Sequence, residues 1–377
     1  MFSNKAFKNI DFPIVIIVSL LFIVGLVAIT SATKFAGNFT YSKQQALWFI
    51  TGIVIMFVVS TLDYNALANV STYLMVLGIV SLVAVLIPSI GTVRGGARCW
   101  FSMPGGFLLQ PSEFVKICFI LNLSKHLSKI KEKGDEGINR PAILALILIY
   151  SAIPIALLIK QPDYGMALVY IAISAAMLFI AGLSNKYILS FIGFAVVAAP
   201  MFFYLILPRM DDHVQKRITA FLDPMADPLG AGYQAAKLQL AIGSGRIFGQ
   251  GIFKGIQTQM AKGGLPTKET DSIFAVIGEE FGFVGSTIVV MLFTFLLIRC
   301  IYIAKSASDP CGMFIAIGIT AMLAFQFIQN VGMTIGLMPI TGIPLPFVSY
   351  GGSSMWTNMA AIGLLQSVAM RRKKLKF

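Results

Sequence analysis

Residues 13–33 read PIVIIVSLLFIVGLVAITSAT, a run with no charged side chain. A helix rises about 1.5 Å per residue, so about 20 residues span the roughly 30 Å hydrocarbon core of a bilayer. Because no small-residue cleavage site follows the run, we expect it to be retained as the first membrane helix. The run therefore predicts a protein that folds in a lipid environment.

The composition of the whole chain agrees with this prediction. Of its 377 residues, 57% are hydrophobic and 12% are charged. A soluble domain has about 25% charged residues, so this composition excludes an ordinary soluble enzyme. We expect an all-α integral membrane protein, one polytopic domain over 1–377, in which the short fourth span is tilted or buried. Apolar windows predict ten transmembrane helices, at 13–33, 46–62, 70–88, 113–124, 141–159, 165–183, 187–207, 273–298, 312–335 and 351–370.

The basic residues predict the orientation. Fifteen Lys and Arg residues lie on the side of the N-terminus and five in the short loops of the other side. Short cytoplasmic loops carry the excess of basic residues, so we expect a multi-pass plasma-membrane protein with both termini cytoplasmic, including a basic tail at 371–377. The net charge of +13 does not indicate nucleic-acid binding, because Lys and Arg are not gathered beside exposed aromatic residues.

Segment 208–272, between the seventh and eighth predicted spans, is expected to be a long extracellular loop. A structureless connection of this length is uncommon and is usually functional. The segment is rich in glycine and carries eight basic residues, which suits a phosphate-bearing, partly lipidic substrate. Stretch 234–247 is weakly amphipathic, which favours a helix at the outer membrane surface. The alternative is a flexible loop whose lysines only touch anionic headgroups. The candidate substrate-binding residues in it are Arg217, Gln234 and Lys237.

Three carboxylates lie at or just inside the eighth predicted span. Asp271 precedes the helix, where an Asp is commonly an N-cap, and the alternative is a catalytic role. Glu279 and Glu280 lie inside the span, where a charge is costly and tends to face the bundle interior or a wet cavity. The alternative for these two is a polar pair near the interface, beside glycines that allow close helix packing.

The outer loop 89–112 and the helix after it supply a second group of candidates. Glu113 and Lys116 are spaced i, i+3, which favours a structural ion pair. In the functional alternative, Arg98 and Lys116 line a pyrophosphate site and Glu113 orients one of them. Trp100 is either an interfacial aromatic residue or a platform for a sugar ring.

Two further loops complete the candidates. Loop 160–165 is a tight outer turn that carries Asp163. Loop 336–354 has several prolines and glycines, almost no charge, and Ser349. Such a re-entrant segment is tolerated at membrane depth only if protein covers its backbone, and it could shape an opening for a lipid tail.

Six motifs, which follow one another in the same order as in the family, resemble the SEDS family, the group of RodA, FtsW and SpoVE. The resemblance covers nearly the whole chain. The chain departs from the family pattern at Gly245, which is followed by Arg246 where relatives have Gly. The motifs are Gln110-Pro111-Ser112-Glu113, Gln161-Pro162-Asp163, Asp223-Pro224 with Gly232-Tyr233-Gln234, Ala241-Ile242-Gly243-Ser244-Gly245, Thr270-Asp271 with the helix start to Glu280, and Gly336 to Ser354.

The resemblance, which is greatest to RodA, implies a peptidoglycan glycosyltransferase that polymerises lipid II outside the plasma membrane, for elongation, division or sporulation. It implies that Asp271 is essential, that Trp100 is important, and that a class B penicillin-binding protein is the partner. We expect no organic cofactor, and a divalent cation, Mg²⁺ or Mn²⁺, at Asp271 or Glu269. The alternatives are a lipid II flippase and a noncatalytic scaffold of the cell-wall synthesis complex.

Overall fold

The computed structural model describes residues 10–34, 39–103, 107–201, 204–205, 207–209, 212–223, 227, 230–260 and 263–372. Ten long helices in these ranges match the ten predicted spans one for one, although α8 ends earlier than its predicted span. They are α2 (Phe12–Ala32), α3 (Thr40–Thr61), α4 (Tyr64–Ala84), α5 (Pro111–Glu132), α6 (Pro141–Lys160), α7 (Tyr164–Ile180), α8 (Asn185–Met201), α12 (Ile273–Ser306), α13 (Pro310–Thr334) and α14 (Gly352–Met370).

Six of these helices are long and apolar enough to cross a membrane: α2, α3, α4, α6, α12 and α13. Helices α5 and α14 are more polar, and their polar side chains are buried against neighbouring helices, as at Asn122, Asn358 and Gln366. The bundle screens these residues from lipid, so α5 and α14 tolerate them. The expectation that the fourth span is buried is therefore confirmed.

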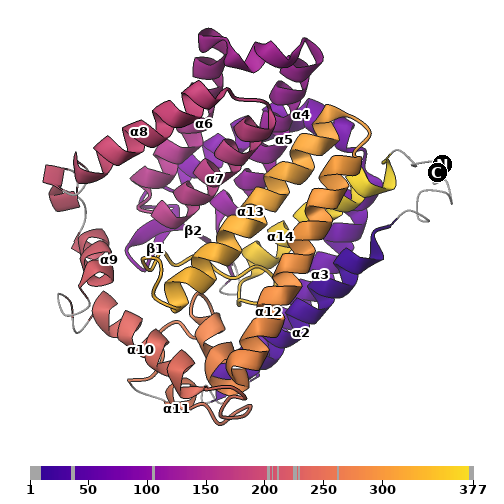
Figure 1. The fold of residues 1–377 in the computed structure, drawn as a ribbon. Helices are drawn as coiled ribbons and strands as arrows, with labels where there is room; N and C mark the ends of the chain where they lie inside the picture. Colours follow the sequence, from indigo (N-terminus) through magenta and orange to yellow (C-terminus); the bar gives the residue numbers. More distant parts are fainter. Residues whose placement is uncertain are drawn as a thin grey trace.

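Helix α13 lies at the centre of the bundle, with α12 and α14 beside it, α2 packed against α12 and α3 packed against α14 (Figure 1). The short helices α10 (Ala231–Ser244) and α11 (Ile256–Gln259) gather at one end of the bundle (Figure 1). We call this end the α10 end. The start of α12 also lies there, because α10 and α11 both pack against α12.

The connections at the α10 end are more regular than the sequence predicts. The strands β1 (Gly91–Arg94), β2 (Ala97–Ser102) and β3 (Leu108–Leu109) form an antiparallel sheet, in the order β1-β2-β3. The expectation that 208–272 is structureless is wrong, because it contains α9 (Asp212–Leu222), α10 and α11. The amphipathic helix predicted at 234–247 corresponds to α10. A short 3-10 helix at Leu207–Arg209 precedes α9, and another at Asp135–Asn139 joins α5 to α6 away from this end.

Helix α12 is broken at Gly282, whose φ of 68° is a left-handed conformation that suits glycine. A break in a membrane helix leaves main-chain groups without their helical partners, and in lipid each must find another. The loop after α10 supplies them: Gln250 N donates to Glu279 O at 2.9 Å, and Phe283 N donates to Arg246 O at 2.8 Å. The loop and the kinked helix are thus one hydrogen-bonded unit.

Candidate functional site

The carboxylate of Asp271 is not used to cap α12. The N-cap residue is Ser272, and it makes no side-chain capping bond. Asp271 Oδ1 accepts a hydrogen bond from the Thr270 hydroxyl at 2.9 Å. Within the described ranges no donor is recorded for Oδ2, and the side chain is only half-buried. The N-cap alternative is therefore wrong, and a carboxylate oxygen of Asp271 is available to a ligand.

The main chain around Asp271 is held by α13. Asn330, a buried amide on α13, donates from Nδ2 to the backbone oxygen of Asp271 at 2.9 Å and to that of Ile343 at 2.8 Å. One side chain thus joins the segment 267–272 to the loop 335–351 between α13 and α14. Gly342 lies directly beside the carboxylate, since a Cβ built on it would be 3.8 Å from Asp271 Oδ2.

Ser349 is part of the same support. Its Oγ donates to Thr270 O at 2.6 Å and accepts from Leu345 N at 2.8 Å. Tyr350 N donates to Glu269 O at 2.9 Å. Ser349, a predicted substrate-binding residue, therefore contacts the chain that carries Asp271. We call the two joined segments, 267–272 and 341–351, the Asp271 cradle.

A third segment adds Asp163 to this region. Asp163 Oδ2 accepts from Gln110 Nε2 at 2.8 Å, and Gln110 N in turn donates to Ser353 Oγ at 3.2 Å. A Cβ on Gly165 would lie 2.8 Å from Thr341 O, so the turn packs directly on the cradle. Burial raises the pKa of Asp163 to about 6, partly offset by hydrogen bonds from Met166 N and Gln110.

Two lysines at the α10 end have neutral hydrogen-bond partners. Lys237 Nζ donates to Gln257 Oε1 at 3.0 Å, and Lys268 Nζ donates to Thr258 O at 2.7 Å. Both acceptors are neutral, and no ion pair of either lysine is recorded with a described residue. Burial lowers the pKa of Lys268, while Glu269 raises it. Cations fixed in this way by neutral partners remain able to bind an anion.

Glu279 is fully buried and binds the protein's own backbone. It accepts from Gln257 N at 2.7 Å, Thr258 N at 2.8 Å and Thr258 Oγ1 at 2.6 Å. These donors belong to α11, the same short segment that Lys237 and Lys268 hold. The contacts make Glu279 a support for the two lysines.

Glu280 is also buried, and it links α2 to α11. Its Oε1 accepts from Ser31 Oγ at 2.5 Å and from Gln259 Nε2 at 3.2 Å. Both glutamates thus lie inside the protein, where they bind main-chain and side-chain donors.

Glu113 and Lys116 form the ion pair that their spacing predicts. Both side chains are almost completely inaccessible to solvent, with 2% and 0% exposure. A lysine that is buried and neutralised in this way does not present its charge to a pyrophosphate in this conformation. The geometry supports the structural ion pair rather than the functional alternative.

Arg98 and Trp100 lie on β2. This strand pairs with β3, and Gln110, which follows β3, contacts Asp163 and Ser353 near the cradle. Arg98 Nη1 donates to Gly91 O at 3.1 Å, so it closes its own hairpin. Trp100 is half-buried and pairs with Thr92 across the strands. A ring that is partly exposed on a sheet can stack on a sugar.

Arg217 is exposed on α9, and Gln234 is half-buried on α10. Neither makes a recorded contact with the cradle. The predicted basic tail lies outside the described residues from 373 onwards, as do the basic residues before residue 10, and Pro224 of the predicted Asp-Pro motif.

A metal site with three protein ligands is not present in the part of the chain that the structure describes. Asp271 and Glu269 are two carboxylates in one loop. Mg²⁺ commonly binds one or two carboxylates together with substrate phosphates. The donor set therefore fits a cation that is shared with a phosphate-bearing ligand, and does not fit a cation held by protein alone.

Several residues of the site were missed by the sequence analysis. Asn330 and Gln45 are buried amides in apolar helices, and Gln45 Nε2 donates to Ser349 O at 3.0 Å. Polar side chains inside a membrane span are themselves a signal of function or tight support. Lys268 lies three residues before Asp271, so its closeness to the predicted catalytic residue could have been read from the sequence.

The fold and the cradle define a polytopic membrane protein with a polar site at the α10 end of its bundle. A family model described as a cell cycle protein, FtsW/RodA/SpoVE, matches residues 9–374. The chain belongs to this family. The family resemblance inferred from the motifs is thereby confirmed.

Curated relatives align over most of the chain. Stage V sporulation protein E of Bacillus subtilis is 39% identical, over 95% of this chain and 96% of its own. A probable peptidoglycan glycosyltransferase FtsW of Geobacter metallireducens is 36% identical over 98% and 97%. Peptidoglycan glycosyltransferase MrdB of Escherichia coli K12 is 35% identical over 86% and 84%. These values lie too close together to single out one branch, so the greater likeness to RodA remains an interpretation of the motifs.

Solved structures share the fold. One, described as structural coordination of polymerization and crosslinking by a peptidoglycan synthase complex, has a TM-score of 0.80 at 29% identity and covers 97% of this chain and 99% of its own. The rod shape determining protein RodA of Thermus thermophilus has a TM-score of 0.70 at 26% identity, with 97% and 98% covered. The ten-helix arrangement is thus shared with solved members of the family.

Proposed function

We propose that the chain is a peptidoglycan glycosyltransferase that polymerises lipid II into glycan strands. The family and the names of its relatives support this activity. The observation that carries the site is the Asp271 carboxylate, which is free of a capping role and belongs to a main-chain segment that Asn330 and Ser349 hold through the backbone oxygens of Asp271 and Thr270. A group positioned in this way is suited to general base catalysis.

In the proposed reaction, Asp271 accepts the proton of the acceptor sugar's 4-hydroxyl. The resulting oxygen attacks C1 of the donor sugar, a C1–O4 bond forms with inversion, and the bond from C1 to the lipid pyrophosphate breaks. The pyrophosphate leaves with the electron pair as an anion. Lys237 and Lys268 are the cations placed to stabilise it, because their recorded partners are neutral.

We propose Lys268 in place of Lys116 as a phosphate ligand, because Lys116 is paired with Glu113 and buried. Arg98 and Arg217, which lie outside the cradle, remain proposed contacts for the phosphates. Trp100 is the proposed platform for a sugar ring, and Gln234 is a proposed polar contact on α10. A divalent cation, Mg²⁺ or Mn²⁺, bound by Asp271 or Glu269 would add positive charge for the phosphates.

We place the α10 end at the outer face of the plasma membrane, with both termini cytoplasmic. The excess of basic residues on the opposite side supports this orientation. The proposed partner is a class B penicillin-binding protein that crosslinks the new strand. The similar synthase complex, in which polymerization is coordinated with crosslinking, supports such a partner.

Incubating the purified protein with lipid II separates the three candidate functions. A polymerase yields glycan strands on a gel, alone or after addition of its transpeptidase partner. A flippase moves labelled lipid II across a vesicle membrane without polymer, and a scaffold does neither. Absence of polymer both with and without the partner would refute the proposed activity.

A further inference from the structure

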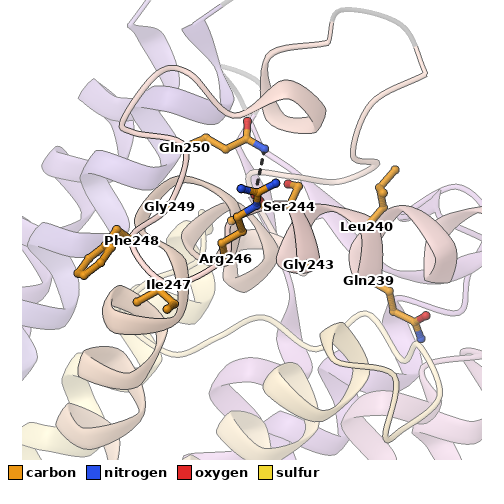
Figure 2. Close-up of a pocket in the computed structure, with 10 residues that line it drawn as sticks. Gln239, Leu240, Gly243, Ser244, Arg246, Ile247, Phe248, Gly249 and Gln250 are labelled. Carbon is orange, nitrogen blue, oxygen red and sulfur yellow. Dashed lines mark hydrogen bonds between the residues drawn. The ribbon is translucent and has the colours of Figure 1, made fainter.

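A cavity of about 970 Å³ lies beside the loop that follows α10 (Figure 2). Residues between Gln239 and Gln250 line it, and none of its lining residues belongs to the Asp271 cradle. Successive helical residues are about 100° apart, so Gln239 lies about 200° around α10 from Lys237. Gln239 therefore points away from Lys237, whereas Leu240 and Ser244, about 60° and about 20° around α10 from Lys237, line the cavity from the side of that lysine.

Arg246 is the charged residue of this cavity. Its φ is 49°, a left-handed conformation that glycine adopts freely and an L side chain adopts at a cost. The loop enforces this conformation, because Arg246 O accepts from Phe283 N at the break in α12. The side chain is exposed, and no ion pair or side-chain hydrogen bond is recorded for it with a described residue. A guanidinium presented in this way can bind a phosphate through two parallel hydrogen bonds.

The apolar residues around Arg246 continue into the lipid-facing side of the bundle. Phe248 is 81% exposed, and Ile247 is also exposed. Below them, one face of α12 stays exposed along its length, at Val284, Ile288, Met291 and Phe295. Apolar loop residues next to a cation, above a lipid-facing helix, are typical of contact with the headgroup and upper acyl region of a bilayer.

We propose that this cavity binds the phosphate of an anionic phospholipid from the surrounding leaflet. Arg246 binds the phosphate, the exposed amide of Gln239 contacts the headgroup, and an acyl chain follows Phe248 onto α12. The bilayer is the favoured source, because the cavity opens beside the lipid-facing side of α12 and shares no residue with the cradle. The site goes beyond the polymerase activity and does not depend on it.

Native mass spectrometry of the purified protein tests this proposal, with palmitoyl-oleoyl phosphatidylglycerol as the probe. Arg246→Gly removes the cation and suits the positive φ, so folding is preserved. The matched control is Lys254→Gln, which removes a positive charge from an exposed residue outside the cavity. We expect Arg246→Gly to weaken phosphatidylglycerol binding by about tenfold, the loss typical of one charge-assisted hydrogen-bonding group, and Lys254→Gln to leave it within about twofold.

Binding measurements with further ligands identify the source of the phosphate. Phosphatidylcholine should bind more weakly than phosphatidylglycerol, and inorganic phosphate should not compete at equal concentration. Unchanged binding in Arg246→Gly would overturn the proposal. An equal loss of phosphatidylglycerol binding in both variants would also overturn it, because it would indicate only an effect of general surface charge. Tighter Arg246-dependent binding of undecaprenyl pyrophosphate than of phosphatidylglycerol would overturn it as well, because it would indicate a site for the substrate lipid. Lipid II polymerisation in neutral detergent is expected to be unchanged in Arg246→Gly, so this site can fail or succeed independently of the proposed activity.

Discussion

Replacing Asn330 with the isosteric leucine should slow polymerisation without weakening substrate binding. Its two hydrogen bonds, at 2.9 Å to Asp271 O and 2.8 Å to Ile343 O, hold the cradle together. Each such bond contributes about 1 kcal/mol net, so Asn330→Leu removes about 2 kcal/mol. That energy corresponds to about a 30-fold change in the ratio of ordered to displaced cradle.

We therefore expect kcat for lipid II polymerisation to fall, by up to about 30-fold, with KM within about twofold of the wild-type value, because Asn330 touches the backbone and not the substrate. Gln326→Met is the matched control: Gln326 is equally buried, lies one turn earlier on α13, and its amide has no recorded hydrogen bond. Wild-type kcat in Asn330→Leu, or an equal loss in Gln326→Met, would show that Asn330 does not position Asp271.

Three further predictions concern stability, each measured by unfolding of the purified protein in detergent. The pKa of Asp163 is raised to about 6, so the folded state binds this proton more tightly than the unfolded state, and stability falls as the pH rises from about 4 to about 6. Asp163→Asn should remove about 3 kcal/mol of that pH dependence, and parallel pH profiles of the variant and the wild type would contradict this. Gly249→Ala should destabilise by about 2 kcal/mol or more, since its φ is 80° and a Cβ would overlap the carbonyl of Glu280, whereas Gly243→Ala, with open space around it, should not. Glu113→Leu should cost about 3–5 kcal/mol by leaving Lys116 buried and unpaired, and the double variant Glu113→Leu, Lys116→Met should recover most of that loss; no recovery would argue against a structural ion pair.

The ten helices could be predicted because membrane thickness sets the length of each apolar run. The fourth span was the hardest case, since α5 carries Glu113 and Lys116, and only their burial against each other explains how the helix is accommodated. The sheet at 91–109 was missed because its strands are short and are stabilised by pairing across a turn, a contact that apolar periodicity does not report.

The chemistry of the site could be predicted in part. The motifs single out Asp271 and Ser349, but they do not reveal that Asn330 holds the backbone of the first, because that contact joins residues 59 positions apart. The break of α12 at Gly282 depends equally on distant chain, since the loop at 246–251 replaces the lost hydrogen bonds. Interactions between segments far apart in sequence position the main chain that carries Asp271, and apolar periodicity and short motifs do not report such contacts.

Replacing Asp271 with Asn tests the central claim most directly, because the amide keeps the shape and the Thr270 contact but cannot accept the hydroxyl proton. The measurement is the rate of glycan strand formation from lipid II by the purified variant, with its transpeptidase partner present and with its unfolding temperature matched to the wild type. We expect the rate to fall by at least about 100-fold, the usual contribution of a general base. Polymerisation by Asp271→Asn at the wild-type rate would contradict the account.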